Sequence, residues 1–169
     1  MIAQARQALM DQLIAHEAMR LKPYTDTVGK ITLGCGRNLT DVGLSLAEAM
    51  VLLEHDVDAA ITDLSAAFPW YLRLDAVRQR VVTDMRFNLG PRRFRGFTRM
   101  IAALAAGDYV LAAQQMRASK WFRQVRSRGV RLARMMETGV ASAERPAGPR
   151  TGPCATGAGA RSAAGSPAR

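Results

Sequence analysis

The sequence predicts an α+β fold in which a small N-terminal antiparallel sheet is followed by a mainly helical lobe. Apolar residues recur at helical spacing before residue 22 and again after residue 74, whereas the segment 24–38 alternates as short strands do. The chain has 169 residues, 49% apolar and 22% charged, so one core can be buried without a metal or disulfides. We expect a single folded domain over residues 1–140.

The first element is expected to be a helix from Ile2 to about Lys22, because its apolar residues follow the i, i+3, i+4, i+7 pattern. Pro23 should end it, since the residue before proline avoids the α region. Residues 31–34 then alternate between large apolar side chains and small or polar ones. This change of period predicts a hairpin or three-stranded sheet, with residues 28–30 as a loop.

A second helix is expected to begin at Ser45, which forms a capping box with Glu48. Its buried face would hold Leu46, Met50, Leu53 and Val57. From Leu74 onward the sequence predicts helices only, at about 74–89, 97–106, 108–117 and 127–137, punctuated by glycines.

Residues 141–169 differ in composition from the rest, because 21 of these 29 residues are Ala, Gly, Pro or Ser. Such a segment buries too little apolar surface to offset its ordering entropy, which predicts a flexible tail. The N-terminal residues lack the pattern of a signal peptide, so we expect accumulation in the bacterial cytoplasm. No apolar run approaches a membrane span, and two cysteines exclude a disulfide scaffold.

The charge is strongly basic, with a net value of +10 and a pI near 10.9. The segment from Arg92 to Arg134 contains ten arginines and Lys120 but only one acid, Asp108. A surface of this kind implies a polyanionic partner. Nucleic acid, anionic lipid and the anionic polymers of a bacterial envelope all satisfy that requirement, and charge alone does not choose among them.

Glu17 is the first candidate for chemistry, because it lies on the apolar face of the first predicted helix, beside Leu13 and Ile14. Desolvation there would raise the pKa of its carboxyl and favour the protonated form that a general acid needs. The alternative interpretation is an ordinary ion pair between Glu17 and one of the many arginines.

Asp26 and Thr32 lie on opposite arms of the predicted hairpin, with their side chains on the same face. A carboxyl at a helix end and a second carboxyl beside a hydroxyl suit two-carboxylate glycoside hydrolysis. One carboxylic acid protonates the leaving oxygen, and the other carboxylate holds water on the far face of the sugar. Taken separately, Asp26 and Thr32 are also ordinary turn and strand residues.

Eight residues of this region have the spacing of a family signature: Glu17, Leu21, Tyr24, Asp26, Gly29, Thr32, Gly34 and Gly36. The pattern resembles the active site of phage-type lysozymes, the bacteriophage T4 endolysin group of glycoside hydrolase family 24. The resemblance covers about residues 8–140, including the segment 74–90 and the closing segment 128–139.

This resemblance implies a lysozyme-like fold and a muramidase that hydrolyses the β-1,4 bond between N-acetylmuramic acid and N-acetylglucosamine in peptidoglycan, with inversion. Glu17 would be the proton donor, Asp26 the general base or water-orienting carboxylate, and Thr32 a residue that seats the water. Positions matching sugar contacts are Phe87, Asn38, Met100 and Gln115. Arg128 matches an arginine that pairs with the catalytic glutamate, and no cofactor or metal is implied.

The resemblance also implies a biological role, as a bacteriolytic endolysin that lyses the host cell. A holin would open the inner membrane and give it access to peptidoglycan, while the Arg-rich 92–134 stretch attracts it to anionic envelope polymers. We expect a monomer that requires no nucleic acid.

Three departures and three alternatives accompany the resemblance. The connection from Thr40 to Ser45 is shorter than the family's, and Cys35 and Arg37 replace residue types usual there. The alternatives are a cationic membrane- or nucleic-acid-binding protein with a relic active site, a lytic transglycosylase, and an inactive prophage copy. A transglycosylase needs the acid but not Asp26, so the presence of Asp26 favours the hydrolase.

Overall fold

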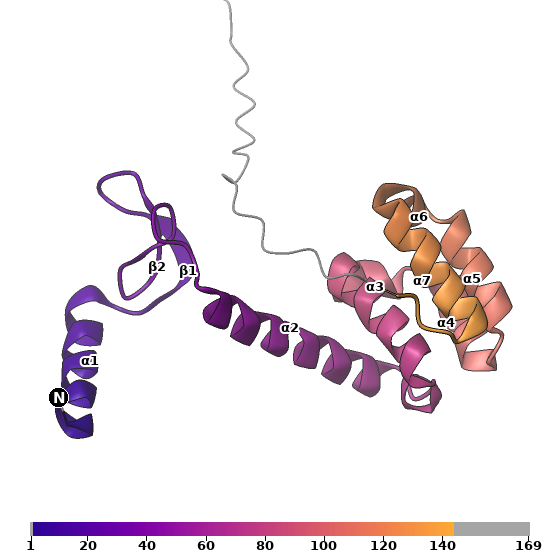
Figure 1. Cartoon of the computed structure of the whole chain (residues 1–169), viewed down its shortest axis with the longest axis horizontal. Helices are drawn as coiled ribbons and strands as arrows, with labels where there is room; N and C mark the ends of the chain where they lie inside the picture. Colours follow the sequence, from indigo (N-terminus) through magenta and orange to yellow (C-terminus); the bar gives the residue numbers. More distant parts are fainter. Residues whose placement is uncertain (1, 144–169) are drawn as a thin grey trace, which may run out of the picture.

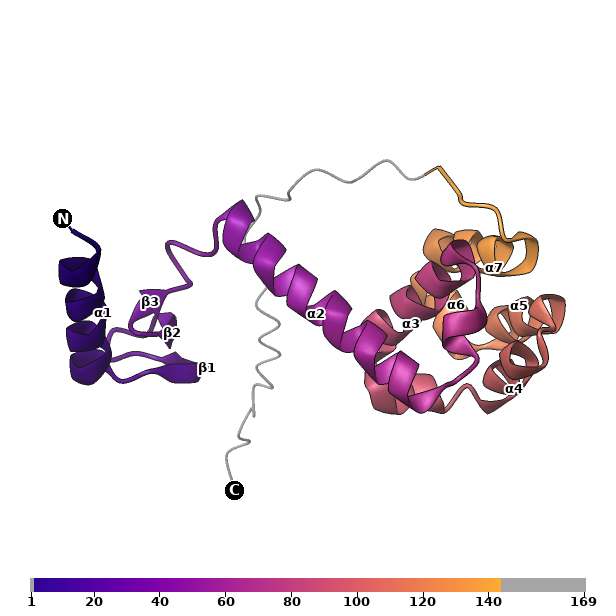
Figure 2. The same ribbon diagram turned by 90° about the horizontal axis from the view of Figure 1, so that it is seen from below.

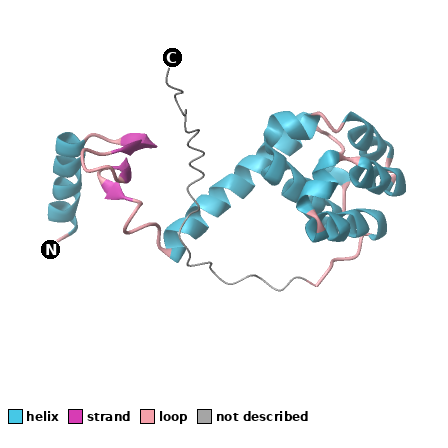
Figure 3. Cartoon of the chain, turned by 90° about the horizontal axis from the view of Figure 1, so that it is seen from above, coloured by secondary structure: helices cyan, strands magenta, loops and turns pink. Residues whose placement is uncertain are grey.

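The computed structural model describes residues 2–143, so most of the predicted 141–169 tail lies outside the described residues. Helices and strands follow in the order α1 (Ala3–Glu17), β1 (Arg20–Thr25), β2 (Ile31–Gly34), β3 (Arg37–Asn38), α2 (Leu46–Ala67), η1 (Tyr71–Arg73), α3 (Ala76–Arg95), α4 (Thr98–Ala106), α5 (Tyr109–Ala118), α6 (Lys120–Val125) and α7 (Ser127–Thr138). A small sheet near the N-terminus thus precedes a helical lobe, which confirms the predicted α+β class (Figure 3). None of the described helices combines the length and apolar character needed to cross a bilayer.

The first helix is shorter than predicted. It ends at Glu17, because Ala18 has a left-handed φ of 57° that turns the chain out of the helix. Residues from Arg20 then hydrogen-bond to β2, so Pro23 lies inside β1 and is not a helix terminator. The sheet order β1-β2-β3 makes β1 an edge strand, which is where a strand tolerates proline.

Helix α2 begins with the predicted capping box. The Ser45 hydroxyl accepts from the Glu48 backbone N–H, and the Glu48 carboxylate accepts from the Ser45 N–H. The helix then runs 22 residues, with α1 and the sheet at one end and α3–α7 at the other (Figures 1 and 2).

The predicted buried face of α2 is wrong over its first half. Leu46, Met50 and Leu53 are 70%, 44% and 42% exposed, and the buried residues are Ala60 and Leu64. The bundle therefore covers only the C-terminal part of α2, and the apolar stripe of its first half faces solvent in this structure.

The helices α3–α7 enclose the hydrophobic core, whose large, fully buried members include Phe94, Leu64, Met85, Met100, Leu104, Met116, Met135 and Met136. Helix α3 continues beyond the predicted end, through a kink at Gly90, whose φ of 74° is non-helical. The short helix α6 escaped prediction, since six residues are too few for a period to be recognised. Gly139 terminates α7 in a left-handed conformation, as predicted.

Candidate active site

The hairpin of β1 and β2 brings Asp26 and Thr32 together, as the sequence predicts. The register differs from the expected one, because Thr32 pairs with Tyr24, two residues before Asp26, which follows the end of β1 at Thr25. The Thr32 hydroxyl nevertheless reaches an Asp26 carboxylate oxygen, Oδ2, at 3.3 Å. Thr32 is 3% exposed and Asp26 is half-buried, so the pair lies at the inner side of the turn.

The other Asp26 oxygen is held by the turn itself. Oδ1 accepts the backbone N–H groups of Lys30, at 2.8 Å, and Val28, at 3.0 Å. The Lys30 N–H bond is the main cause that holds the pKa of Asp26 below its usual value, with Val28, Thr32 and the Lys30 charge acting in the same direction against desolvation. Asp26 is therefore an ionised carboxylate at neutral pH, the state required of a base.

We expect Thr32→Val to lower hydrolysis by about tenfold to a hundredfold. Valine keeps the shape of threonine but removes the hydroxyl, so the Asp26 carboxylate loses one hydrogen bond to its charged form. Its pKa then rises, and the acid limb of the kcat/KM profile moves to higher pH. Profiles of wild type and variant on purified peptidoglycan would measure this, with Thr138→Val as a control outside the sheet. An unchanged acid limb would contradict the role as a base that the family resemblance implies for Asp26.

Glu17 lies at the C-terminal end of α1, beside the turn between β2 and β3. A Cβ atom at Gly36 would lie 3.8 Å from the Glu17 oxygen Oε2, so the carboxylate faces that turn. Gly36 has a φ of 78°, a conformation that glycine adopts without strain. The expected burial of Glu17 on an apolar face is wrong for this arrangement, because no residue of α1 is buried and Glu17 is exposed.

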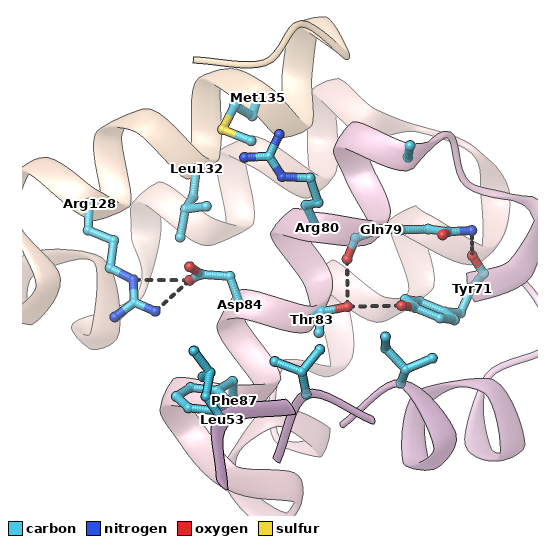
Figure 4. Close-up of a pocket in the computed structure, with 13 residues that line it drawn as sticks. Leu53, Tyr71, Gln79, Arg80, Thr83, Asp84, Phe87, Arg128, Leu132 and Met135 are labelled. Carbon is cyan, nitrogen blue, oxygen red and sulfur yellow. Dashed lines mark hydrogen bonds and ion pairs between the residues drawn. The ribbon is translucent and has the colours of Figure 1, made fainter. Parts of the chain in front are cut away.

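Phe87 lies on the other lobe, in a groove of about 600 Å³ between α2, α3 and α7 (Figure 4). Apolar side chains of all three helices line it: Leu53, Val57, Ile61, Phe87, Leu132 and Met135. Phe87 is 43% exposed, which leaves its ring accessible from the groove.

Arg128 lies in the same groove but not beside Glu17. Its guanidinium donates to the Asp84 carboxylate, with Nε at 3.0 Å and a terminal nitrogen at 2.9 Å from Oδ1. The expected pairing of Arg128 with Glu17 is therefore wrong in this structure, since α1 lies at the opposite end of α2 from α7 (Figures 1 and 2).

Asp84 is a groove residue that sequence reasoning missed. It is half-buried and faces Arg128 from α3 (Figure 4). A signal was present, because Asp75 and Asp84 are the only acids between Asp63 and Asp108, and Asp84 stands within the apolar pattern of a core helix.

The remaining predicted sugar contacts are scattered. The Asn38 amide is engaged in its own turn, donating to the Asp41 carboxylate at 2.9 Å and accepting the Asp41 N–H at 3.0 Å. Gln115 lies in a separate groove between α4 and α5. Met100 is 1% exposed in the core, so it contacts no ligand. The structure therefore brings none of the three to Phe87.

Arg37 connects the sheet to α2. It donates to both Glu48 carboxylate oxygens, at 2.9 and 3.0 Å, and to the Gly43 carbonyl. This departure from the family pattern thus makes a structural ion pair at the start of α2. Within residues 2–143, no group of three acidic, histidine or cysteine side chains is placed to hold a metal.

Sequence comparisons relate most of the chain to known proteins. The chain is 26% identical over 160 residues to the pre-baseplate central spike protein Gp5 of Enterobacteria phage T4, covering 78% of this chain and 28% of Gp5. It is 24% and 25% identical to probable T4-type lysozymes 1 and 2 of Dictyostelium discoideum, spanning 80% and 79% of this chain and 97% and 95% of those proteins. The family model described as phage lysozyme matches residues 14–137, which include Glu17, Asp26 and Thr32. The chain therefore belongs to the phage lysozyme family, which places it among the lysozyme-type glycoside hydrolases.

Proposed function

We propose that this chain is a muramidase that hydrolyses the β-1,4 bond between N-acetylmuramic acid and N-acetylglucosamine in peptidoglycan. Glu17 protonates the leaving glycosidic oxygen as general acid. The Asp26 carboxylate and the Thr32 hydroxyl orient the attacking water on the opposite face of the sugar. The hydrogen bond between Asp26 and Thr32 carries this proposal, because it pairs a carboxylate kept ionised with a buried hydroxyl at the signature spacing.

The hydrogen bonds of Asp26 favour an inverting mechanism. Oδ1 accepts two backbone N–H groups and Oδ2 faces the Thr32 hydroxyl, so both oxygens already have partners. A carboxylate held in this way is a poorer nucleophile than a free one, and it suits the orientation of water. Water then attacks the anomeric carbon directly, and the product has the inverted configuration.

Catalysis by this site requires α1 to leave its exposed position. Four large apolar residues of α1 are 39–46% exposed: Leu9, Met10, Leu13 and Ile14. The groove that contains Phe87 and Arg128 is likewise lined by apolar side chains and has room for a helix face. We infer that α1 docks in this groove of its own chain, because both surfaces lose apolar exposure when they meet.

Docking of α1 would unite the two halves of the site. Glu17 ends α1, so a docked helix carries its carboxylate toward the lobe that contains Phe87. The Arg128 guanidinium, which is paired with Asp84 in this structure, would then lie near that carboxylate and stabilise its charge after proton donation.

Analysis of the products tests the reaction itself. We expect purified peptidoglycan treated with the protein to yield new reducing ends, with the α-anomer formed first from the β-linked substrate. Mass spectrometry and rapid NMR of the digest would measure both. A 1,6-anhydromuramic product would identify a lytic transglycosylase instead, and a β-anomer would contradict inversion.

Host-cell lysis as an endolysin is the biological role that we propose for this activity. The enzyme would act as a monomer, and a holin would give it access to peptidoglycan from the bacterial cytoplasm. The Arg-rich 92–134 stretch would hold it at an anionic component of the envelope and needs no nucleic acid.

A further inference from the structure

The two halves of the molecule carry opposite charge. Residues 2–75, which form α1, the sheet, α2 and η1, hold ten acidic and six basic side chains. Residues 76–143, which form the helices α3–α7, hold three acidic and fourteen basic ones. The helices of the second half lie together at one end of the molecule (Figures 1 and 2), so the positive charge is concentrated there.

Helices α6 and α7 carry several of these basic residues. Five exposed cations between residues 120 and 134 are called here the α6–α7 basic edge: Lys120, Arg123, Arg126, Arg131 and Arg134. None of them makes an ion pair with another residue of the described part of the chain, whereas Arg117 and Arg128 do. Their charges are therefore not neutralised within residues 2–143.

Buried side chains on the other faces of α6 and α7 attach these two helices to the core. Trp121 is 4% exposed and donates its indole N–H to the side-chain oxygen Oδ1 of Asn88 at 2.8 Å. Leu132 and Met136 bury the opposite face of α7. The buried sides of both helices are anchored in this way, so the helices present these cations to solvent from fixed backbone positions.

The scarcity of exposed aromatic and large apolar side chains on α6 and α7 indicates which kind of polyanion this surface binds. Stacking of single-stranded nucleic acid needs exposed aromatic side chains in a basic groove, but Trp121 is buried and Phe122 is only partly exposed. Val130 is the one exposed large apolar residue of α6 and α7, so deep insertion into hydrocarbon is also disfavoured. Exposed cations with few exposed aromatic or large apolar side chains among them fit a layer of charges that can move laterally to match them.

We propose that the α6–α7 basic edge is a binding site for the anionic phospholipid headgroups of a membrane surface. Lipid phosphates diffuse in the plane and can gather around the five cations, and arginine binds phosphate oxygens in a bidentate manner. The site is independent of Glu17, so the protein binds membranes whether or not it hydrolyses peptidoglycan.

Arg126 offers a sharp test, because its backbone has a φ of 49° and a ψ of −121°, a region that favours glycine. Arg126→Gly is therefore expected to fold with an unchanged or higher Tm while it loses one cation. If Arg126 had only a structural role, Arg126→Gly would lower the Tm and leave vesicle binding unchanged.

The experiment is co-sedimentation of the full chain with vesicles of phosphatidylethanolamine, with and without phosphatidylglycerol. We expect salt-sensitive binding only to vesicles that contain phosphatidylglycerol. Arg126→Gly should bind about fivefold more weakly, and Arg131→Gln with Arg134→Gln about tenfold or more. The matched control is Arg6→Gln with Arg73→Gln, which removes the same charge from the other half of the chain and should bind as wild type does.

Equal loss in the control pair would reduce the effect to net charge and overturn the proposal. So would binding to uncharged vesicles, or tighter binding to duplex DNA than to phosphatidylglycerol vesicles at the same salt concentration. Glu17→Gln should bind the vesicles like wild type, so failure of the muramidase assignment is distinguishable from failure of this one.

Discussion

Glu17→Gln is expected to lower the release of reducing ends from peptidoglycan by about a thousandfold, within the 10²–10⁴ range of general acid catalysis. Glutamine keeps the size and hydrogen-bonding capacity of glutamate but carries no acidic proton. Because Glu17 is exposed at the end of α1 and makes no ion pair within residues 2–143, the substitution should leave stability unchanged. Initial rates at equal folded concentration, with thermal unfolding of both proteins, would measure these effects.

Glu54→Gln is the matched control, since Glu54 is also an exposed glutamate without an ion pair in the described residues. It should retain full activity. Activity of Glu17→Gln within a few-fold of wild type would remove Glu17 as the acid. If wild type itself releases no reducing ends, the signature is a relic and the cationic binding alternative gains support.

Leu13→Asp is expected to lower kcat/KM by about a hundredfold, the scale of loss when a catalytic group is displaced by an ångström or more. Leu13 is 46% exposed in this structure, so an aspartate is tolerated in the open arrangement. In the docked arrangement the new carboxylate would enter an apolar groove and shift the equilibrium away from docking. Steady-state kinetics and the exposure of α1 to hydrogen exchange would report this together.

Leu111→Asp provides the comparison, because Leu111 is 39% exposed on α5, outside the Phe87 groove. Its activity should stay near wild type. If Leu13→Asp is as active as Leu111→Asp, docking of α1 plays no part in catalysis, although Glu17 retains its proposed role.

Local sequence signals predicted much of the fold. The capping box of Ser45 and Glu48 formed as expected, and so did the hairpin, although its loop spans residues 26–30 and not 28–30; both depend on residues close in sequence. The end of α1 was misplaced, since Ala18 carries no visible signal for a positive φ. The face of α2 was misjudged for another reason: periodicity identifies an apolar stripe but does not say whether another helix covers it.

In the candidate site too, contacts between residues close in sequence were predictable and long-range contacts were not. Asp26 and Thr32 were predictable, because a hairpin brings together residues six apart in the chain. The partner of Arg128 was not predictable, because its ion pair with Asp84 joins residues 44 apart in the chain and depends on how α3 packs against α7. Long-range pairings of this kind follow from tertiary packing, which spacing alone does not reveal.

The Arg37 guanidinium at the foot of α2 has a mechanical consequence. A helix of 22 residues is a stiff arm of about 33 Å, so a tilt of about 10° at its base moves the far end by about 6 Å. Arg37 braces that base by binding both Glu48 oxygens and the carbonyl of Gly43, whose φ of 65° lies in the connection that would bend. The torsional stiffness of residues 37–48 therefore sets how strongly the position of the sheet relative to the bundle is fixed, because any bend there is amplified along the 22 residues of α2.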